Sequence, residues 1–362
     1  MKKKKNKKST ICLTMIVKNE ASCIARCLNY MKDYIDYWVI CDTGSVDNTV
    51  NIIKETMAGI PGEVLHHQWQ DFATNRNLGI EAAKEKADYT LIMDADDSLI
   101  VEDKNIFNNL NKDAYRLKIK HGTLEYYRPQ LIKNTIDFKY KGVLHEYIEL
   151  PQCEYVQLDG CYIQTSFNGA RSRNPNKFKD DAEVLEKALI AEPNNDRYRF
   201  YLAQSYRDAR MDLKAIENYE KRAMMGGWRE EIFISLLEAA KAKERLGFNI
   251  YDIECAYLKA SYAHPGRAEP LYYLSKLFRC TNNMIKAYCY AKLSLQIPKP
   301  EEALFLEEDC YYYKRLDELG ICSYYIGHID EGRYACEELL KLNIPTEEKQ
   351  RIENNLRFYL KK

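Results

Sequence analysis

The sequence is short of the features that mark membrane-spanning and zinc-binding proteins. The longest apolar stretch near its start, residues 11–17, is followed at once by Lys18-Asn19-Glu20. A spanning helix needs about 20 apolar residues, and no small-residue cleavage pattern follows the stretch, so we predict a buried first strand here and no signal peptide. The 12 cysteines include no CxxC pair and no zinc-ligand spacing. We therefore expect free thiols, a reducing compartment and a cytoplasmic location.

The chain also lacks net charge, since 54 basic residues balance 54 acidic ones. Six of the lysines lie in the first eight positions, so the remaining 48 basic residues face 54 acidic ones. A mildly acidic body is a poor nucleic-acid surface, and we expect no such partner. We interpret residues 1–10 as a flexible basic tail, which could at most give peripheral contact with an anionic membrane.

The 362 residues predict at least two domains, and the first 170 alternate between strand and helix patterns. The predicted strands cover residues 11–17, 37–41, 63–69 and 89–93, and the predicted helices cover residues 21–34, 47–57 and 72–86. Such alternation is typical of a mostly parallel sheet with helices on both faces. The segments AYRLKIK, GVLHEYIEL and YVQLDGCYIQ, between residues 114 and 168, predict a mixed edge of the same sheet.

A polar stretch at residues 165–176 predicts a domain boundary, and residues 177–362 show only helical patterns. Small and aromatic residues alternate there as in tetratricopeptide helix pairs, at Leu202, Ala203, Tyr206, Ala215 and Tyr219. The equivalent leucines recur at 236, 274 and 319, in steps of 34, 38 and 45 residues, which indicates insertions in later units. An irregular helical bundle is the alternative.

Acidic residues follow two of the predicted strands. Asp42 comes after the second strand, and Asp94, Asp96 and Asp97 come after the fourth. Ligands of open parallel sheets bind beyond the carboxyl ends of the strands, so both turns are expected to face one crevice. An Asp-x-Asp turn there can hold Mg²⁺ or Mn²⁺, which leaves positions open for substrate phosphates, whereas a merely solvated acidic turn is the alternative.

Four segments together carry a family resemblance: LTMIVKNEASCIARCL, VICDTGSVDNT, FATNRNLGIEAA and YTLIMDADD. In order and spacing they resemble family 2 glycosyltransferases, and later segments such as NPNKFKDDAEVLEKAL are similar to members with a C-terminal tetratricopeptide region. The resemblance implies an α/β GT-A domain (Rossmann-like, with a mostly parallel sheet) at residues 11–170. An all-α tetratricopeptide-like repeat domain would follow at residues 177–362.

The same resemblance implies inverting transfer from a nucleotide sugar, usually a UDP-sugar, with a metal ion. It assigns nucleotide-sugar contacts to Val17, Glu20, Asp42, Arg76 and Asp94. Asp94 and Asp96 would ligate the metal.

The remaining candidates come from the residue types alone. Glu146 is the expected general base and Asp97 its substitute, because inverting transfer needs a group that takes the acceptor's proton. His145 could complete the metal shell or hold the phosphate, although neighbours on a strand point to opposite faces. Arg128 could contact the diphosphate or form a surface salt bridge. We interpret His66, His67, Trp69 and Trp228 as structural residues, the tryptophans as core or interface anchors.

The leading hypothesis is a metal-dependent glycosyltransferase whose helical region recognises a protein or glycan acceptor or forms a homodimer. The rival hypothesis is a tetratricopeptide scaffold that carries an inactive transferase domain. The four acids Glu20, Asp42, Asp94 and Asp96 favour activity. A nucleotidyltransferase would be expected to carry a Gly-rich basic loop after the first strand, where this chain has VKNEAS.

Overall fold

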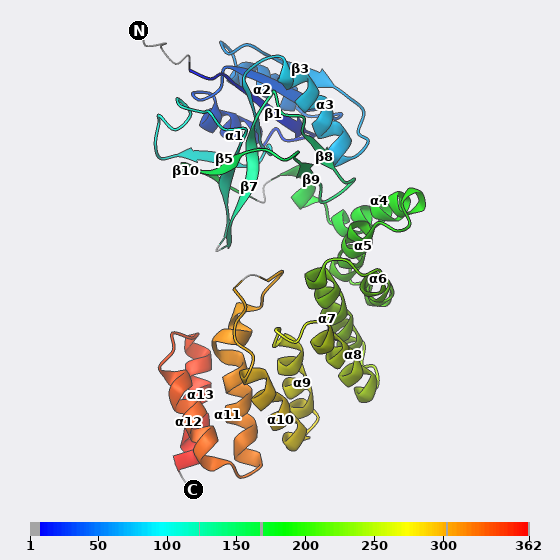
Figure 1. Cartoon of the computed structure of the whole chain (residues 1–362), viewed down its shortest axis with the longest axis vertical. Coiled ribbons are helices and arrows are strands. Elements are labelled where there is room, and N and C mark those ends of the chain that lie inside the picture. Colours follow the sequence, from blue (N-terminus) through cyan, green and yellow to red (C-terminus); the bar gives the residue numbers. More distant parts are fainter. Residues whose placement is uncertain (1–7, 123, 167–168, 302, 361–362) are drawn as a thin grey trace. The chain divides into compact units, whose positions relative to one another are not determined.

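The structure is a computed structural model that describes residues 8–122, 124–166, 169–301 and 303–360 (Figure 1). Most of the predicted basic tail, residues 1–7, lies outside the described residues. The chain divides into two compact units, Met1–Ala188 and Leu189–Lys362. Helix α4 (Lys177–Ala191) begins where the helical region was expected to begin, but most of it lies in the first unit.

The described part of the first unit is built on one eight-stranded sheet, in the order β3-β2-β1-β4-β7-β6-β10-β5. Its strands are β1 (Ile11–Val17), β2 (Tyr37–Asp42), β3 (Gly62–His66), β4 (Tyr89–Ile92), β5 (Ser98–Val101), β6 (Ala114–His121), β7 (Leu124–Lys133) and β10 (Tyr155–Gln164). Four of the seven neighbouring pairs in this sheet are parallel, and the three antiparallel pairs all involve β5 or β7. The predicted mostly parallel sheet with a mixed edge is confirmed.

Helices pack on both faces of the parallel half. On one face, α1 (Ile24–Met31) and α2 (Thr49–Thr56) join the buried alternate residues of β1 in the main core. On the other face, α3 (Phe72–Lys84) approaches β1 so closely that a Cβ atom on Gly79 would lie 2.6 Å from Thr14 Oγ1. A glycine at this position therefore lets the helix lie against the sheet.

One predicted strand of the mixed edge is wrong. Of residues 142–150, only Tyr147–Glu149 form a strand, β9, which pairs with β8 (Lys139–Lys141) in a separate two-stranded sheet. Gly142 and His145 have φ values of 106° and 52°, in the left-handed region that interrupts an extended strand. Residues 142–146 are consequently irregular, so strand alternation does not separate His145 from Glu146.

The second unit consists of helix pairs, as the small and aromatic pattern predicts. A short 3₁₀ helix, η1 (Ala170–Arg173), precedes α4 in the first unit. The helices that follow α4 are α5 (Asp196–Asp208), α6 (Asp212–Met224), α7 (Arg229–Arg245), α8 (Ile250–Ala263), α9 (Glu269–Cys280), α10 (Met284–Leu295), a π-helix η2 (Cys310–Lys314), α11 (Arg315–Tyr325), α12 (Ile329–Leu340) and α13 (Thr346–Leu360). All five residues of the first predicted repeat are buried. At a later pair, a Cβ on Gly320 would lie 3.5 Å from Ala335, so a small residue brings α11 close to α12.

A buried ion pair joins α6 to α7. The Arg222 side chain is 0% exposed, and its Nη2 lies 2.9 Å from Glu231 Oε2. Its Nη1 donates to the Gly226 carbonyl at 2.7 Å. Glu231 is thus the buried counter-charge, and its removal would leave Arg222 with only the half-exposed Asp196, 3.3 Å away, as a charged partner.

We predict that Glu231→Ala destabilises the helical unit by about 3–5 kcal/mol, because breaking a buried pair leaves an uncompensated charge. Urea unfolding of the full chain, followed by far-UV circular dichroism, measures the change. Glu217→Ala is the control, because Glu217 forms an exposed pair with Lys221 on the same α6 helix and should leave the midpoint unchanged. Equal midpoints for the two variants would contradict the prediction.

Candidate active site

Helix α3 places an arginine between two of the predicted catalytic segments. Asp71 caps the helix by accepting from the Thr74 amide at 2.8 Å, so α3 begins at Phe72 and Arg76 lies on its second turn. Arg76 Nη2 lies 2.6 Å from Asp94 Oδ1, and Arg76 Nε lies 2.8 Å from Glu146 Oε1. The structure thereby brings together three residues that the sequence placed in the site for separate reasons.

This arginine is held by charge and by an aromatic ring. Its side chain is 11% exposed, and its guanidinium carbon lies 5.3 Å from the centre of the Tyr140 ring. Burial opposes the charged form of Arg76, but Asp94 and Glu146 raise its pKa overall. Burial likewise opposes ionisation of Asp94, yet Arg76 and then Arg128 lower its pKa. Arg128 Nη2 lies 3.8 Å from Asp94 Oδ2, so Asp94 sits between two arginines.

The other two acids of this turn lack such compensation. Burial, followed by the charge of Asp94, raises the pKa of Asp96. Asp97 is 5% exposed, and burial together with the charges of Asp94 and Asp96 raises its pKa to about 8. A carboxyl group with such a pKa is mostly protonated at neutral pH as long as no cation occupies the turn. The turn is electrostatically suited to receive a cation.

Two predicted ligand-binding acids hold the segment that leads into η1. Asp96 Oδ2 accepts from the Gly169 amide at 3.1 Å, and Glu20 accepts from the Ala170 amide at 3.1 Å. Burial raises the pKa of Glu20. The polar composition of this segment predicts a domain boundary, and its contact with Asp96 and Glu20 was not predicted. Local sequence carries no signal for it, since the contact joins residues about 70 and 150 positions apart.

Asp42 does not belong to the cluster of Arg76, Asp94 and Glu146. It is buried, accepts from the Ser45 amide at 3.1 Å, and lies 3.3 Å from His66 Nδ1. Strand β1 lies between β2 and β4, so the two acidic turns are about two strand spacings, or ~10 Å, apart. The expected contact of Asp42 with the nucleotide sugar stays a prediction.

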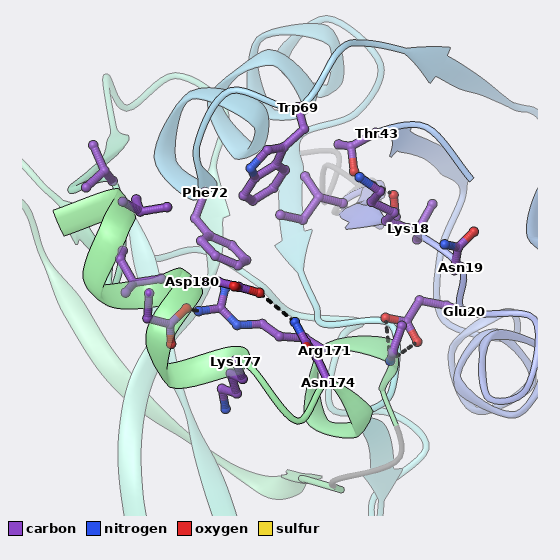
Figure 2. A pocket seen from close by; sticks show the side chains of 17 residues that line it. Lys18, Asn19, Glu20, Thr43, Trp69, Phe72, Arg171, Asn174, Lys177 and Asp180 are labelled. Atoms are coloured by element: carbon purple, nitrogen blue, oxygen red, sulfur yellow. Dashed lines mark hydrogen bonds and ion pairs between the residues drawn. The ribbon is translucent and has the colours of Figure 1, made fainter. Parts of the chain in front are cut away.

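A cavity of about 460 Å³ opens at the carboxyl ends of β1 and β2 (Figure 2). Val17, Lys18, Glu20, Thr43 and Leu144 are among its lining residues. Leu144 belongs to the irregular segment of residues 142–146, which ends at Glu146. This segment therefore connects the cavity wall with the cluster of Arg76, Asp94 and Glu146.

Aromatic side chains form one wall of this cavity. Trp69 is 39% exposed, and its ring lies edge-on to Phe72 with centroids 4.7 Å apart. The Arg171 guanidinium lies 4.4 Å from the Phe72 ring and pairs with Asp181. Of the two structural roles predicted for Trp69, core residue or interface anchor, the core role is therefore wrong. Neither Phe72 nor Arg171 was predicted as a site residue. The sequence offers one signal for Phe72, since it lies with Trp69 around Asp71 as an aromatic pair.

The predicted metal set does not assemble as a closed cage. Within the residues that the structure describes, no three His, Cys, Asp or Glu side chains are grouped so that they could hold a metal ion. His145 is exposed and has a φ of 52°. All twelve cysteines lie among the described residues and are free. In the same part of the chain, no helix has both the length and the apolar character needed to cross a membrane.

Two curated proteins are similar to parts of this chain. The SPbeta prophage-derived glycosyltransferase SunS of Bacillus subtilis (strain 168) is 26% identical over 228 residues, which cover 59% of this chain and 53% of that protein. A tetratricopeptide-repeat-containing protein of Synechococcus elongatus is 33% identical over 148 residues, or 38% of this chain and 35% of that protein. The chain thus spans about half or less of the length of these relatives.

Solved structures resemble the fold at low identity. Residues 1–349 of S. aureus TarS, in complex with UDP-GlcNAc, are 14% identical, with 70% of this chain and 91% of that chain covered and a TM-score of 0.40. The protein MamA is 18% identical, with 50% of this chain and 95% of that chain covered and a TM-score of 0.39. Among protein families, the model of glycosyl transferase family 2 matches residues 12–150. This match spans strands β1 to β9 and includes Arg76, the Asp94 turn and Glu146.

Proposed function

We propose that the chain is a metal-dependent, inverting glycosyltransferase that moves a sugar from a UDP-sugar to a protein or glycan acceptor. The observation that carries the proposal is the Arg76 bridge, which joins Asp94 to Glu146 beside a cavity at the strand ends. The family of residues 12–150 supports sugar transfer. The cavity supports a nucleotide donor, because ligands of open α/β sheets bind beyond the strand ends.

The nucleoside would occupy the cavity between the β1 end and the aromatic wall. Trp69 offers an exposed ring on which a base can stack, and Thr43 and Asn19 offer polar groups for its edge. The walls of Figure 2 carry Lys18 as well, whose ammonium group favours an anionic ligand. Val17 and Glu20, to which the family resemblance assigned nucleotide-sugar contacts, also line the cavity.

The diphosphate would lie toward the Asp94 turn. Arg76 and Arg128 supply positive charge there, and the uncompensated Asp96 fits a hard cation. Mn²⁺ or Mg²⁺ in such sites uses one or two carboxylates and takes its other ligands from phosphates and water, so no cage of three side chains is required. When bound, the ion neutralises charge on the leaving diphosphate. Asp96 is our proposed ligand, with Asp94 nearby; His145 stays a prediction.

The acceptor's proton would pass to Glu146. Its carboxylate is oriented by Arg76, and it follows an irregular segment that lines the cavity. Asp97 is the poorer candidate because its side chain is buried, which leaves little access for an acceptor hydroxyl. We further propose that the helical unit binds the acceptor or a second copy of the chain.

Metal dependence is tested by titration calorimetry with UDP. We expect clear binding with Mn²⁺ or Mg²⁺ and little binding in EDTA. Asp96→Asn should weaken the metal-dependent binding sharply, because a neutral amide is a poorer ligand for a hard cation than a carboxylate. Asp103→Asn, on an exposed turn, is the control. Equal UDP affinity of the Asp96→Asn variant and the parent would remove Asp96 from the metal site.

The aromatic wall is tested with Trp69→Ala. Stacking on an aromatic side chain contributes about 1–3 kcal/mol per base, so UDP affinity should fall by about 5- to 150-fold. Trp228→Ala removes an exposed tryptophan of the helical unit and should leave UDP affinity unchanged. If the two variants bind UDP equally well, the base does not stack on Trp69.

The proton acceptor is tested with Glu146→Gln. This change keeps the side-chain size and removes the base, so kcat should fall by about 10²- to 10⁴-fold while UDP affinity changes little. The assay measures nucleotide release from a panel of nucleotide sugars. Glu149→Gln, at an exposed pair with Lys141, controls for charge loss in the same segment. Full activity of Glu146→Gln would exclude the role, and inactivity of the parent on every donor would favour the scaffold hypothesis.

A further inference from the structure

One side of the cavity at the strand ends is built by residues that follow the family-matched region. The match ends at residue 150, whereas η1 and the first turns of α4 also line the cavity. They contribute Arg171 from η1 and Asp181 from α4. The cavity therefore depends on a part of the chain whose polar composition predicts only a domain boundary.

Arg171 is fixed from two directions. Its Nη2 atom pairs with Asp181 Oδ1, and the Asp181 side chain is only 10% exposed. The preceding residue is fixed as well, because the Ala170 amide donates to Glu20 at 3.1 Å. A carboxylate so far out of water holds its cationic partner firmly, since loss of the pair would leave a buried charge uncompensated.

The guanidinium group of Arg171 lies against an aromatic ring. Its central carbon is 4.4 Å from the centre of the Phe72 ring. Phe72 in turn meets Trp69 edge-on, with an angle of 82° between the ring planes and 4.7 Å between the ring centres. Asp181, Arg171, Phe72 and Trp69 therefore form one continuous series of contacts along the cavity wall (Figure 2).

These contacts favour a role for Arg171 through the ring rather than through its charge. The charge is already balanced by Asp181, whereas the flat guanidinium is the part of the side chain that fits a ring face. A lysine at the same position would keep the charge but has no plane to lay on Phe72. The two contributions can therefore be separated by a single substitution.

We propose that Arg171 is a positioning residue for the nucleoside of the donor. It holds the Phe72 ring, and through that ring it holds Trp69 in the orientation in which a base stacks. Asp181 fixes Arg171 and acts through it. This role rests on the proposed function, because it assumes that the nucleoside occupies the cavity beside Trp69.

The physical benefit is preorganisation. A ring that is already held when the base arrives loses little conformational freedom on binding, whereas a ring that must be immobilised by the base costs affinity. The expected loss is about 2- to 10-fold in affinity for each side chain that is no longer held. It acts on the base and ribose, so it is the same for a nucleoside and for its diphosphate.

The test compares uridine with UDP, each titrated into the full chain with Mn²⁺ present and followed by calorimetry. We expect Arg171→Lys to weaken both ligands by the same factor, about 2- to 10-fold. Asp181→Asn should do the same, and the double variant should lose no more than either single variant, because both residues act through one series of contacts.

Arg173→Lys is the matched control. Arg173 lies on the same short helix, is exposed, and donates from Nη1 to the Ser22 hydroxyl at 3.1 Å. This substitution makes the same chemical change two residues away from Arg171. It should bind uridine and UDP as the parent does.

A second readout needs no ligand. The chain has three tryptophans, so labelling with 5-fluorotryptophan gives three fluorine resonances, and Trp69→Phe identifies that of Trp69. Arg171→Lys and Asp181→Asn should shift or broaden the Trp69 resonance and leave those of Trp38 and Trp228 in place. Arg173→Lys should leave all three unchanged.

Several results would overturn the proposal. A loss of affinity for UDP without a loss for uridine would mean that Arg171 contacts the diphosphate. A Trp69 resonance that is unchanged in both variants would mean that Arg171 does not orient the ring. A parent chain that binds neither ligand would overturn the nucleoside site of the proposed function and this role with it. A parent that binds both, with Arg171→Lys equal to it, would overturn the role of Arg171 alone.

Discussion

The contact of Arg76 with Asp94 and Glu146 joins three segments of the first unit that are far apart in sequence. Asp94 follows a central strand, and Glu146 follows a turn between two small strands 52 positions later. The Glu146 side chain is only 13% exposed and the Asp94 side chain 34%, so a nearby cation stabilises both carboxylates. Without Arg76, Asp94 would face Asp96 and Asp97 with only the more distant Arg128 as compensation, and Glu146 would lose its orientation.

The position of Arg76 depends in turn on how α3 lies against the sheet. Asp71 begins the helix, and Gly79 lets its middle approach β1. These two features place the arginine side chain at the strand ends, where Asp94 begins its turn. The same first turn carries Phe72 into the cavity wall, so one helix serves both the charged cluster and the proposed nucleoside pocket.

Acidic side chains act differently in the two units. In the first unit, Asp96 and Glu20 accept from the backbone amides of Gly169 and Ala170, so the candidate donor site holds the segment that precedes η1. In the second unit, Glu230 accepts from the Leu304 amide, and Arg267 donates to the Leu304 carbonyl, in the connection that follows α10. In each case a carboxylate side chain accepts from the backbone amide of a segment outside the sheet and the repeat helix pairs.

The sequence by itself determined the order of strands and helices, the helical second half and the acidic turn after β4, because these depend on local periodicity and on residue types. It failed at residues 142–150, where the apolar pattern predicts a strand but Gly142 and His145 take left-handed conformations. It named Arg76, Asp94 and Glu146 but not their joint contact. Only the tertiary structure decided that contact, the exposure of Trp69 in a cavity wall and the contacts of Leu304 with Glu230 and Arg267, because each depends on segments that are distant in the chain and adjacent only after folding.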